Sequence, residues 1–255
     1  MRLQGKTIVV TGTSSGIGAE VARLARFQGA TVIGVDRNDP SLTLDGFVKA
    51  DLSTVDAINA AVAQLPQRID AFCNIAGVPG TASGELVAKV NYLGLRHLTE
   101  QVLPLIPRGG SIVNVASILG AEWPQRLALH KELAAAQGFE AGAQWLRTHE
   151  VPHATCYQYF KEALIVWSTV QSQKWFMEKG VRMNCVAPGP VFTPILGDFV
   201  STLGDERVQK DAHRMLRPGF ADEIAPVIAW LCSDASRWVS GANIPVDGGL
   251  ASTYI

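Results

Sequence analysis

The sequence lacks the features that mark several classes of protein. Its 22 lysine and arginine residues are balanced by 23 aspartate and glutamate residues, so there is no basic surplus for binding nucleic-acid phosphates. No apolar run approaches the roughly 20 residues that a membrane-spanning helix requires, and residues 1–6 do not resemble a secretion signal. We therefore expect a cytoplasmic protein that has neither a nucleic-acid partner nor a membrane contact.

Residues that bind metals or form disulfides are also few. The four cysteines are far apart and none forms a C-x-x-C pair, and the five histidines are scattered, without a pair four residues apart on one predicted helix. Single cysteines within apolar segments usually behave as small buried hydrophobic residues. We expect no metal site, and we expect buried thiols in a reducing compartment at Cys73, Cys156, Cys185 and Cys232.

The residues that are abundant indicate a globular protein. Hydrophobic residues make up 47% of the 255 positions and charged residues 18%, which is typical of a folded domain. A β-branched run at Thr7–Val10 leads through a glycine-rich stretch to a segment, 16–28, whose apolar residues recur at helical spacing. The next run, Thr31–Val35, is almost continuously apolar, as in a strand buried on both faces of a parallel sheet. The chain is therefore predicted to open with a strand, a helix and a strand.

This alternation continues through the chain. Further strands are expected near 47–52, 69–74, 111–115, 181–187 and 243–246, and further helices near 55–64, 86–105, 157–176 and 221–232. Parallel strands need crossover connections, so the alternation predicts an α/β fold. We expect one doubly wound Rossmann-type domain over residues 1–255, with a parallel sheet and helices on both of its faces.

One segment, residues 118–156, contains no expected strand and is interpreted as a helical insertion between a serine-bearing strand and a tyrosine-bearing helix. Helical patterns cover 125–135 and 139–148. The first is predicted to carry an apolar stripe, with Leu127, Leu129 and Leu133 on one side and Gln125, Arg126, His130 and Lys131 on the polar side. The insertion is either a surface excursion or a cover over the substrate, and in the second case Trp123 and Trp145 are expected at the mouth of the substrate site.

The glycine-rich stretch is suited to the pyrophosphate of a dinucleotide. Glycines without side chains allow the backbone to approach the ligand, and the N-terminus of the following helix offers unpaired N–H groups and the positive end of the helix dipole. The residues expected to bind there are Gly12, Ser14, Ser15, Gly16, Ile17 and Gly18.

Asp36 ends the next expected strand, 18 residues after Gly18. A carboxylate at this place accepts hydrogen bonds from both hydroxyls of an adenosine ribose, and it opposes the 2′-phosphate of NADP. This favours NAD as the cofactor, although Asp36 also fits a turn residue at a strand end. Arg37 keeps NADP as an alternative, because a guanidinium group binds a phosphate or stacks on an adenine.

Tyr157 and Lys161 are four residues apart on an expected helix, so they share one face. A free tyrosine has a pKa of about 10, but a nearby ammonium group favours the phenolate. The pair can therefore move a proton while a hydride passes between a nicotinamide and a carbinol carbon. Ser117, directly after a strand, offers a hydroxyl to the substrate oxygen, whereas Tyr159 points to the opposite side of the helix and is expected to pack.

In their order along the chain, these motifs resemble the short-chain dehydrogenase/reductase family. The resemblance covers residues 7 to about 250 and is carried by Thr11–Gly18, Asp51 with Leu52, Asn74–Gly77, Asn91, Ser117, Tyr157 with Lys161, Pro188 with Gly189, Thr193 and Asp247–Gly249. It implies that Asn91 completes a catalytic set with Ser117, Tyr157 and Lys161 by organising a water that relays protons from Lys161. It also implies that Asp51 and Leu52 flank the adenine, that Asn74, Ala76 and Gly77 line the cofactor path, that Val191 and Thr193 hold the nicotinamide carboxamide, and that Pro188, Gly189, Tyr157 and Lys161 also contact the cofactor.

The 40 positions from Ser117 to Tyr157 are more than the family usually has there. The insertion resembles a branch of 3α-hydroxysteroid dehydrogenases and carbonyl reductases, and Ala121–Trp123 and Tyr157–Lys161 resemble dehydrogenases of aryl allylic alcohols. We expect NAD-dependent hydride transfer with a small hydrophobic, aryl or allylic, alcohol or carbonyl. A steroid or quinone-like ketone is the alternative substrate, and a non-catalytic NAD-sensing module is the alternative from another class. The residues that form an apolar wall for the substrate, or else pack the core, are Trp123, Phe139, Trp145, Phe192 and Phe199.

The insertion also bears on self-association. Members of the family commonly associate through the helices placed here at 86–105 and 157–176. Two inserted helices must lie close to that face and would cover it. Any homo-oligomer is therefore expected to form through the edge near 243–249.

Overall fold

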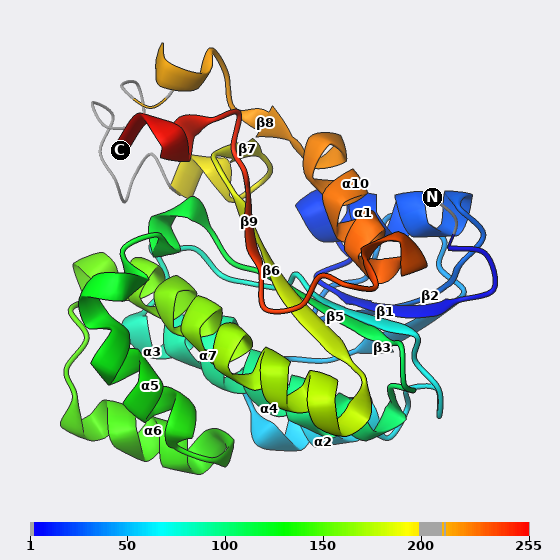
Figure 1. The fold of residues 1–255 in the computed structure, drawn as a ribbon, viewed down its shortest axis with the longest axis horizontal. Coiled ribbons are helices and arrows are strands. Elements are labelled where there is room, and N and C mark those ends of the chain that lie inside the picture. The colour runs from blue at the N-terminus through cyan, green and yellow to red at the C-terminus, as the bar shows by residue number, and fades with distance from the viewer. Residues whose placement is uncertain (1–2, 199–210, 212, 255) are drawn as a thin grey trace.

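The β-branched runs of the sequence form seven parallel strands. The computed structural model describes residues 3–198, 211 and 213–254, and in these residues the sheet has the strand order β3-β2-β1-β4-β5-β6-β9 (Figure 1). The strands are β1 (Thr7–Thr11), β2 (Thr31–Asp36), β3 (Gly46–Lys49), β4 (Ala71–Asn74), β5 (Ser111–Val115), β6 (Arg182–Pro188) and β9 (Asn243–Val246). A separate pair, β7 (Val191–Phe192) and β8 (Gly219–Phe220), lies beyond the carboxyl end of β6. The predicted doubly wound Rossmann-type fold is confirmed.

Helices cover both faces of this sheet. On one face α1 (Gly16–Phe27) packs against α10 (Ala221–Cys232), and on the other lie α2 (Val55–Val62), α4 (Leu95–Val102) and α7 (Cys156–Lys179) (Figure 1). Successive side chains of a strand point to opposite faces. In β1, Val9 therefore belongs to the core under α7, and Ile8 and Val10 belong to the core under α1. Burial on both faces is the reason why these strands are continuously apolar.

The helix expected near 86–105 is a continuous run of four helical pieces. These are α3 (Gly84–Ala88), the π-helix η1 (Lys89–Gly94), α4, and the 3₁₀-helix η2 (Leu103–Leu105). The π-helix ends where Gly94 crosses the backbone of Leu52, so closely that a Cβ atom on Gly94 would lie 2.0 Å from the Leu52 carbonyl oxygen. Short π-helical segments are rare and often occur at functional sites, and this one carries Asn91.

The insertion forms two short α-helices outside the sheet layers. Helix α5 (Leu127–Ala135) packs against α7, and α6 (Gly138–Thr148) packs against α4 and η1 (Figure 1). Three 3₁₀-helices connect them to the rest of the fold, namely η3 (Ile118–Gly120), η4 (Trp123–Arg126) and η5 (His153–Thr155). The two inserted helices and their place over the 86–105 and 157–176 helices are as predicted.

The predicted buried face of α5 is wrong. Leu133 is fully buried, but Leu129 is 39% exposed and His130, assigned to the polar side, is fully buried. Residues 130, 133 and 134 are spaced three and four apart and share one face, whereas Leu127 and Leu129 are two apart and cannot both face α7. A charged partner for His130, described below, explains why a polar residue takes the buried position.

The remaining structural expectations concern cysteines, metals and membranes. All four cysteines are buried and free, as predicted, and the Sγ atoms of Cys73 and Cys232 lie 3.4 Å apart. Within the described ranges, no three His, Cys, Asp or Glu side chains gather as metal ligands would. No helix in the same ranges is both long and apolar enough to cross a membrane.

Candidate active site

The carboxyl ends of the parallel strands meet at one edge of the sheet and surround a pocket of about 530 Å³. The connection from β1 to β2 runs through α1 on one face of the sheet, and the connection from β3 to β4 runs through α2 on the other face. The strand order therefore reverses between β1 and β4, which are neighbours in the sheet. Ligands of open α/β sheets bind at such a switch point. The volume lies within the range of cofactor and substrate sites.

The glycine loop at the end of β1 leaves the N-terminus of α1 open toward this pocket. Ser15 occupies the N-cap position without a side-chain hydrogen bond, and the first turn carries no acidic residue. Gly12 has a φ of +78°, and a Cβ atom there would lie 2.8 Å from the backbone nitrogen of Ala76. Gly18 allows α1 to rest on β1, since a Cβ atom on it would lie 2.1 Å from the Gly12 carbonyl oxygen. The free N–H groups and the absence of side chains fit a pyrophosphate.

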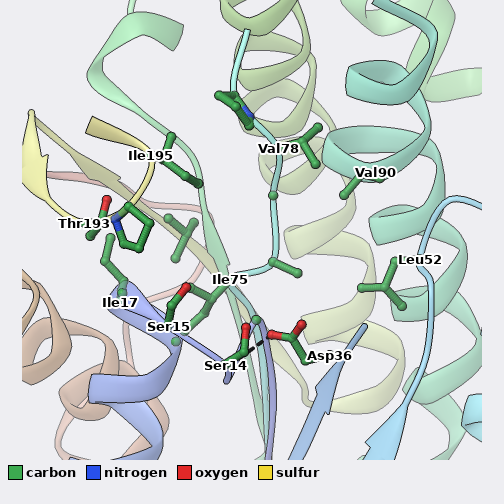
Figure 2. Close-up of a pocket in the computed structure, with 18 of the residues that line it drawn as sticks. Ser14, Ser15, Ile17, Asp36, Leu52, Ile75, Val78, Val90, Thr193 and Ile195 are labelled. Atoms are coloured by element: carbon green, nitrogen blue, oxygen red, sulfur yellow. Dashed lines mark hydrogen bonds between the residues drawn. The ribbon is translucent and has the colours of Figure 1, made fainter. Parts of the chain in front are cut away.

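Asp36 lies at the pocket with its carboxylate held by two backbone N–H groups. The N–H of Ser14 donates to Oδ2 and the N–H of Asn38 donates to Oδ1, each at 2.9 Å, and the residue is 8% exposed (Figure 2). A carboxylate oxygen has a second lone pair, so both oxygens can still accept from ribose hydroxyls. Arg37 is exposed and also lines the pocket.

Other predicted cofactor-binding residues lie on both sides of the pocket. At the end near Asp36, Asp51 is exposed and accepts from the N–H of Ser53 at 2.9 Å, and the buried Leu52 lies beside it. Across the pocket, Thr193 approaches the glycine loop, because a Cβ atom on Gly16 would lie 3.2 Å from its methyl group. The other predicted residues of this region that line the pocket are Ala76, Gly77, Pro188, Gly189 and Val191.

Ser117, Tyr157 and Lys161 meet in the pocket at the end of β5. Ser117 is held by its backbone position at the start of η3, where its Oγ accepts from the N–H of Leu119 at 3.2 Å, and it also hydrogen-bonds Tyr157. Lys161 donates from Nζ to the carbonyl oxygen of Val115 at 2.8 Å, and Nζ lies 5.5 Å from the centre of the Tyr157 ring. The geometry therefore brings together the hydroxyl, phenol and ammonium groups that the sequence placed 40 positions apart.

Burial changes the acidity of two of these groups. It raises the pKa of Tyr157 above its usual value, and the hydrogen bond with Ser117 acts in the opposite direction. Burial lowers the pKa of Lys161 to about 8, because the ammonium form loses hydration, and the nearby Cys185 opposes this only in part. Both shifts favour neutral groups, so an added negative charge in the pocket would favour the ammonium form of Lys161.

Two predicted site residues do not line the pocket. Asn91 uses its side chain on the backbone of Val78, accepting from the N–H at 2.8 Å and donating to the carbonyl at 2.9 Å. Asn74 points into the core, where Nδ2 donates to Thr99 Oγ1 and to Asn114 Oδ1, each at 2.8 Å. Asn91 therefore holds the loop that follows β4, and Asn74 ties β4 to its neighbours.

None of the aromatic residues expected to form a wall for the substrate lines the pocket in the described part of the chain. Neither Trp123 nor Trp145 is among the described residues that line the pocket. The first packs against a small apolar cluster of Ala116, Ile165, Cys185 and Ala187, and the second stacks on His149 at 3.8 Å between ring centres. Phe139 is buried in the core, Phe192 is 48% exposed, and Phe199 lies outside the described residues. The position of the two tryptophans at the substrate mouth stays a prediction. Tyr159 packs, as expected, against His130.

Sequence reasoning missed the apolar end of the pocket. Figure 2 shows Val78 and Ile195 on the opposite side of the pocket from Ser14 and Asp36. The other lining residues that were not predicted are Asn38, Ala50, Ile75, Pro79, Val90, Val115, Ala116, Pro194 and Asp198. Most of them lie in loops or at element ends next to predicted residues, and that adjacency was the only signal in the sequence.

Comparison with known proteins agrees with this geometry. Residues 6–128 match the family described as short chain dehydrogenase, and residues 144–251 match the one described as enoyl-(acyl carrier protein) reductase. The chain is 67% identical, over the full length of both chains, to coniferyl-alcohol dehydrogenase of Pseudomonas sp. (strain HR199 / DSM 7063). It is 33% identical to 3-alpha-hydroxysteroid dehydrogenase/carbonyl reductase of Comamonas testosteroni, covering 95% of each chain.

A solved structure repeats the fold. The 3-alpha-hydroxysteroid dehydrogenase from Pseudomonas sp. B-0831, complexed with NADH, has a TM-score of 0.81 and 29% identity, with 98% of each chain covered. The resemblance stated from the motifs is thereby confirmed, and the non-catalytic alternative receives no support from these relatives. The chain belongs to the short-chain dehydrogenase family, and it is an oxidoreductase.

Proposed function

We propose that the protein is an NAD-dependent dehydrogenase that oxidises a hydrophobic aryl allylic alcohol of the coniferyl alcohol type. The observation that carries this proposal is the meeting of Ser117, Tyr157 and Lys161 inside the dinucleotide-sized pocket. The apolar side chains of Val78 and Ile195, which line the same pocket, suit an aryl group. The 67% identity with a coniferyl-alcohol dehydrogenase supports this substrate class.

In the proposed reaction Tyr157 is the base and Ser117 holds the substrate oxygen. A nicotinamide cofactor, held in this pocket by the glycine loop and Asp36, would accept the hydride that leaves the carbinol carbon. The O–H bond of the alcohol breaks as its proton moves to the Tyr157 oxygen, and the carbon and oxygen are left as a carbonyl group. Lys161, protonated and close to the ring, favours the phenolate that must take this proton. The proton-relay role that the resemblance implies for Asn91 stays a prediction; its bonds to Val78 support a role in shaping the pocket.

We infer NAD rather than NADP from the Asp36 carboxylate. It is buried, it faces the pocket, and its two oxygens each have room for one more donor. A 2′-phosphate in this place would meet a negative charge and would lose the ribose hydrogen bonds. The uncapped N-terminus of α1 supports a pyrophosphate site for either cofactor.

We also propose a cytoplasmic location and, for any homo-oligomer, contact through the β9 edge. Four buried free thiols suit a reducing compartment. Helices α5 and α6 cover parts of α7 and α4, so the face that family members commonly pair is obstructed. Strand β9 is a free edge of the seven-stranded sheet.

A substrate panel tests the proposed function. An aryl allylic alcohol, a 3α-hydroxysteroid and an aliphatic primary alcohol are each offered with NAD and with NADP, and the absorbance of the reduced cofactor is followed. We expect the highest kcat/KM for the aryl allylic alcohol with NAD. Preference for the steroid, the substrate class of the 33% identical relative, would replace the substrate assignment. Cofactor binding without turnover of any alcohol or carbonyl would contradict the proposal.

A further inference from the structure

The chain between Ser117 and Tyr157 is too long to hold these two residues together by itself. A flexible connection of 40 positions constrains its ends weakly. The sheet places the start of this segment, because β5 is bonded to α7 by Asn114 to Ser168 and by Lys161 to Val115. From Ile118 onward the segment leaves the sheet, and its contacts with α7 hold η3, whose first turn engages the Ser117 hydroxyl. Among the described residues, the most buried polar contact of this kind joins Glu162 of α7, Arg126 of η4 and His130 of α5. We refer to these three residues as the clamp.

Glu162 is fully buried and has both carboxylate oxygens occupied. Arg126 donates from Nε to Oε2 at 2.8 Å and from Nη2 to Oε1 at 2.5 Å, and His130 Nε2 lies 2.7 Å from Oε2. Burial alone would raise the pKa of the Glu162 carboxyl, but Arg126 and His130 outweigh it and hold the pKa below its usual range. A two-point bond from a planar guanidinium fixes orientation as well as distance. The clamp thus defines one position of η4 and α5 on α7.

The clamp lies close in sequence to the proposed catalytic groups, both on α7 and on the segment that begins at Ser117. Glu162 directly follows Lys161 on α7. The segment that starts at Ser117 lies on the backbone of this same turn, because a Cβ atom on Gly120 would be 3.0 Å from the Lys161 carbonyl carbon. A few residues later Trp123 packs against the apolar cluster that contains Ile165 of α7. The stretch from Ser117 to Arg126 therefore follows α7 and ends at the clamp.

The far end of α5 is attached to the helix run that carries Asn91. Arg96 of α4, which is 3% exposed, donates from Nη1 to the carbonyl oxygen of Leu133 at 3.2 Å. In α6, Gly142 faces η1 so closely that a Cβ atom on it would lie 2.6 Å from Leu93 Cδ2. The insertion is therefore joined to both helical elements that carry the predicted catalytic set, and the clamp is its charged contact with α7.

We propose that Glu162 is a positioning residue for alcohol oxidation, because its grip on Arg126 and His130 holds the segment that begins at Ser117 against the helix of Tyr157 and Lys161. The proposal rests on the proposed function for its kinetic consequence. Glu162 does not touch the pocket; it acts through the placement of Ser117. A displacement of about 1 Å at a reacting group can cost a factor of about 100 in rate.

The first test is Glu162→Gln, which keeps the shape of the side chain and removes its charge and one acceptor. We expect kcat for the alcohol to fall about ten- to hundredfold. The Kd for NAD, measured by fluorescence titration, should stay within about twofold, because most of the predicted cofactor contacts lie on elements other than α7. Glu140→Gln is the matched control, since Glu140 is an exposed glutamate on the inserted helix α6, and it should leave kcat unchanged. A folded Glu162→Gln enzyme with wild-type kcat would overturn the proposal.

Variants of Arg126 and hydrogen exchange test the clamp independently of Glu162→Gln. If Glu162→Gln does not fold, two variants of Arg126, whose side chain is 35% exposed, replace it. We expect a lower kcat in Arg126→Met than in the wild type, and an intermediate kcat in Arg126→Lys. The same kcat in Arg126→Met and Arg126→Lys would contradict the clamp. In the ligand-free protein, backbone hydrogen exchange of residues 117–126 should be at least about tenfold faster in Glu162→Gln or Arg126→Met than in the wild type. Unchanged exchange would refute the clamp whatever the activity of the enzyme. A wild type that oxidises no alcohol would instead contradict the proposed function and would leave the exchange measurement as the test of the clamp.

Discussion

We expect Asp36 to decide the choice between the two nicotinamide cofactors. Replacing it by alanine removes the acceptor for the ribose hydroxyls and the charge that opposes a phosphate. We expect kcat/KM with NAD to fall by about tenfold or more, because hydrogen bonds worth roughly 1.5–3 kcal/mol are lost. The ratio of kcat/KM with NAD to kcat/KM with NADP should fall as well. Asp39→Ala is the control, since that nearby carboxylate bonds Lys49 at the surface. Equal use of both cofactors by the wild type would mean that Arg37 dominates.

Lys161 predicts a dependence of stability on pH. Its pKa is about 8 in the folded protein and is near 10.5 in an unfolded chain. Below pH 8 Lys161 is protonated in both the folded and the unfolded state, so the folded protein bears the full free-energy cost of burying its charge. Between pH 8 and 10.5 the folded state loses this proton while the unfolded state keeps it. The free energy of unfolding therefore rises with pH over this range. Relative to Lys161→Met, the wild type should gain on the order of 2–3 kcal/mol in unfolding free energy from pH 7 to 10. Parallel pH curves from denaturant titration would contradict this.

Most residues of the candidate site could be predicted from the sequence because they belong to motifs with a local physical reason. The glycines precede a helix N-terminus, Asp36 ends a strand, and Tyr157 and Lys161 share one face of a helix. All the predicted catalytic and cofactor-binding residues except Asn74 and Asn91 line the pocket. Val78 and Ile195 could not be predicted, since their position depends on where two loops meet in space.

At the scale of elements, the contact between α1 and β1 shapes the proposed pyrophosphate site. Gly18→Ala would place a methyl group against the Gly12 carbonyl oxygen, which is backbone and cannot move aside. We expect a loss of about 1–3 kcal/mol in unfolding free energy from overpacking and weaker NAD binding, measured by denaturant and ligand titration. Gly84→Ala at the start of α3 is the control, because a Cβ atom there meets only ordinary contacts at 3.9 and 4.0 Å. Similar results for both variants would contradict the role of this contact.

Strands were easier to predict than the details of helices. Burial on both faces makes the strands β-branched and continuously apolar, and β5 and β9 match the expected 111–115 and 243–246. The π-helix could not be predicted, because it depends on the contact between Gly94 and Leu52, which are far apart in sequence. The buried side of α5 was predicted incorrectly, because the charged partner of His130 is on another helix.

For the whole molecule, the insertion limits how two copies can associate. With α5 on α7 and α6 on α4, we expect any dimer to form through the β9 edge. Light scattering gives the oligomeric state, and a charged substitution, Ile244→Lys on the half-buried edge strand, should lower it if a dimer exists. Cross-links between two copies that join α4 and α7 of one to those of the other would refute this expectation.

The central claim is that Tyr157 moves the proton during alcohol oxidation, and the pair Tyr157→Phe and Tyr159→Phe tests it most directly. Both changes remove one phenol oxygen from the same helix and preserve ring packing. The measurement is kcat for the best alcohol of the panel at saturating NAD, with NAD binding measured in parallel. We predict a fall of about a hundredfold or more for Tyr157→Phe with NAD still bound, and little change for Tyr159→Phe. Wild-type turnover in Tyr157→Phe, or a larger loss in Tyr159→Phe, would contradict the account.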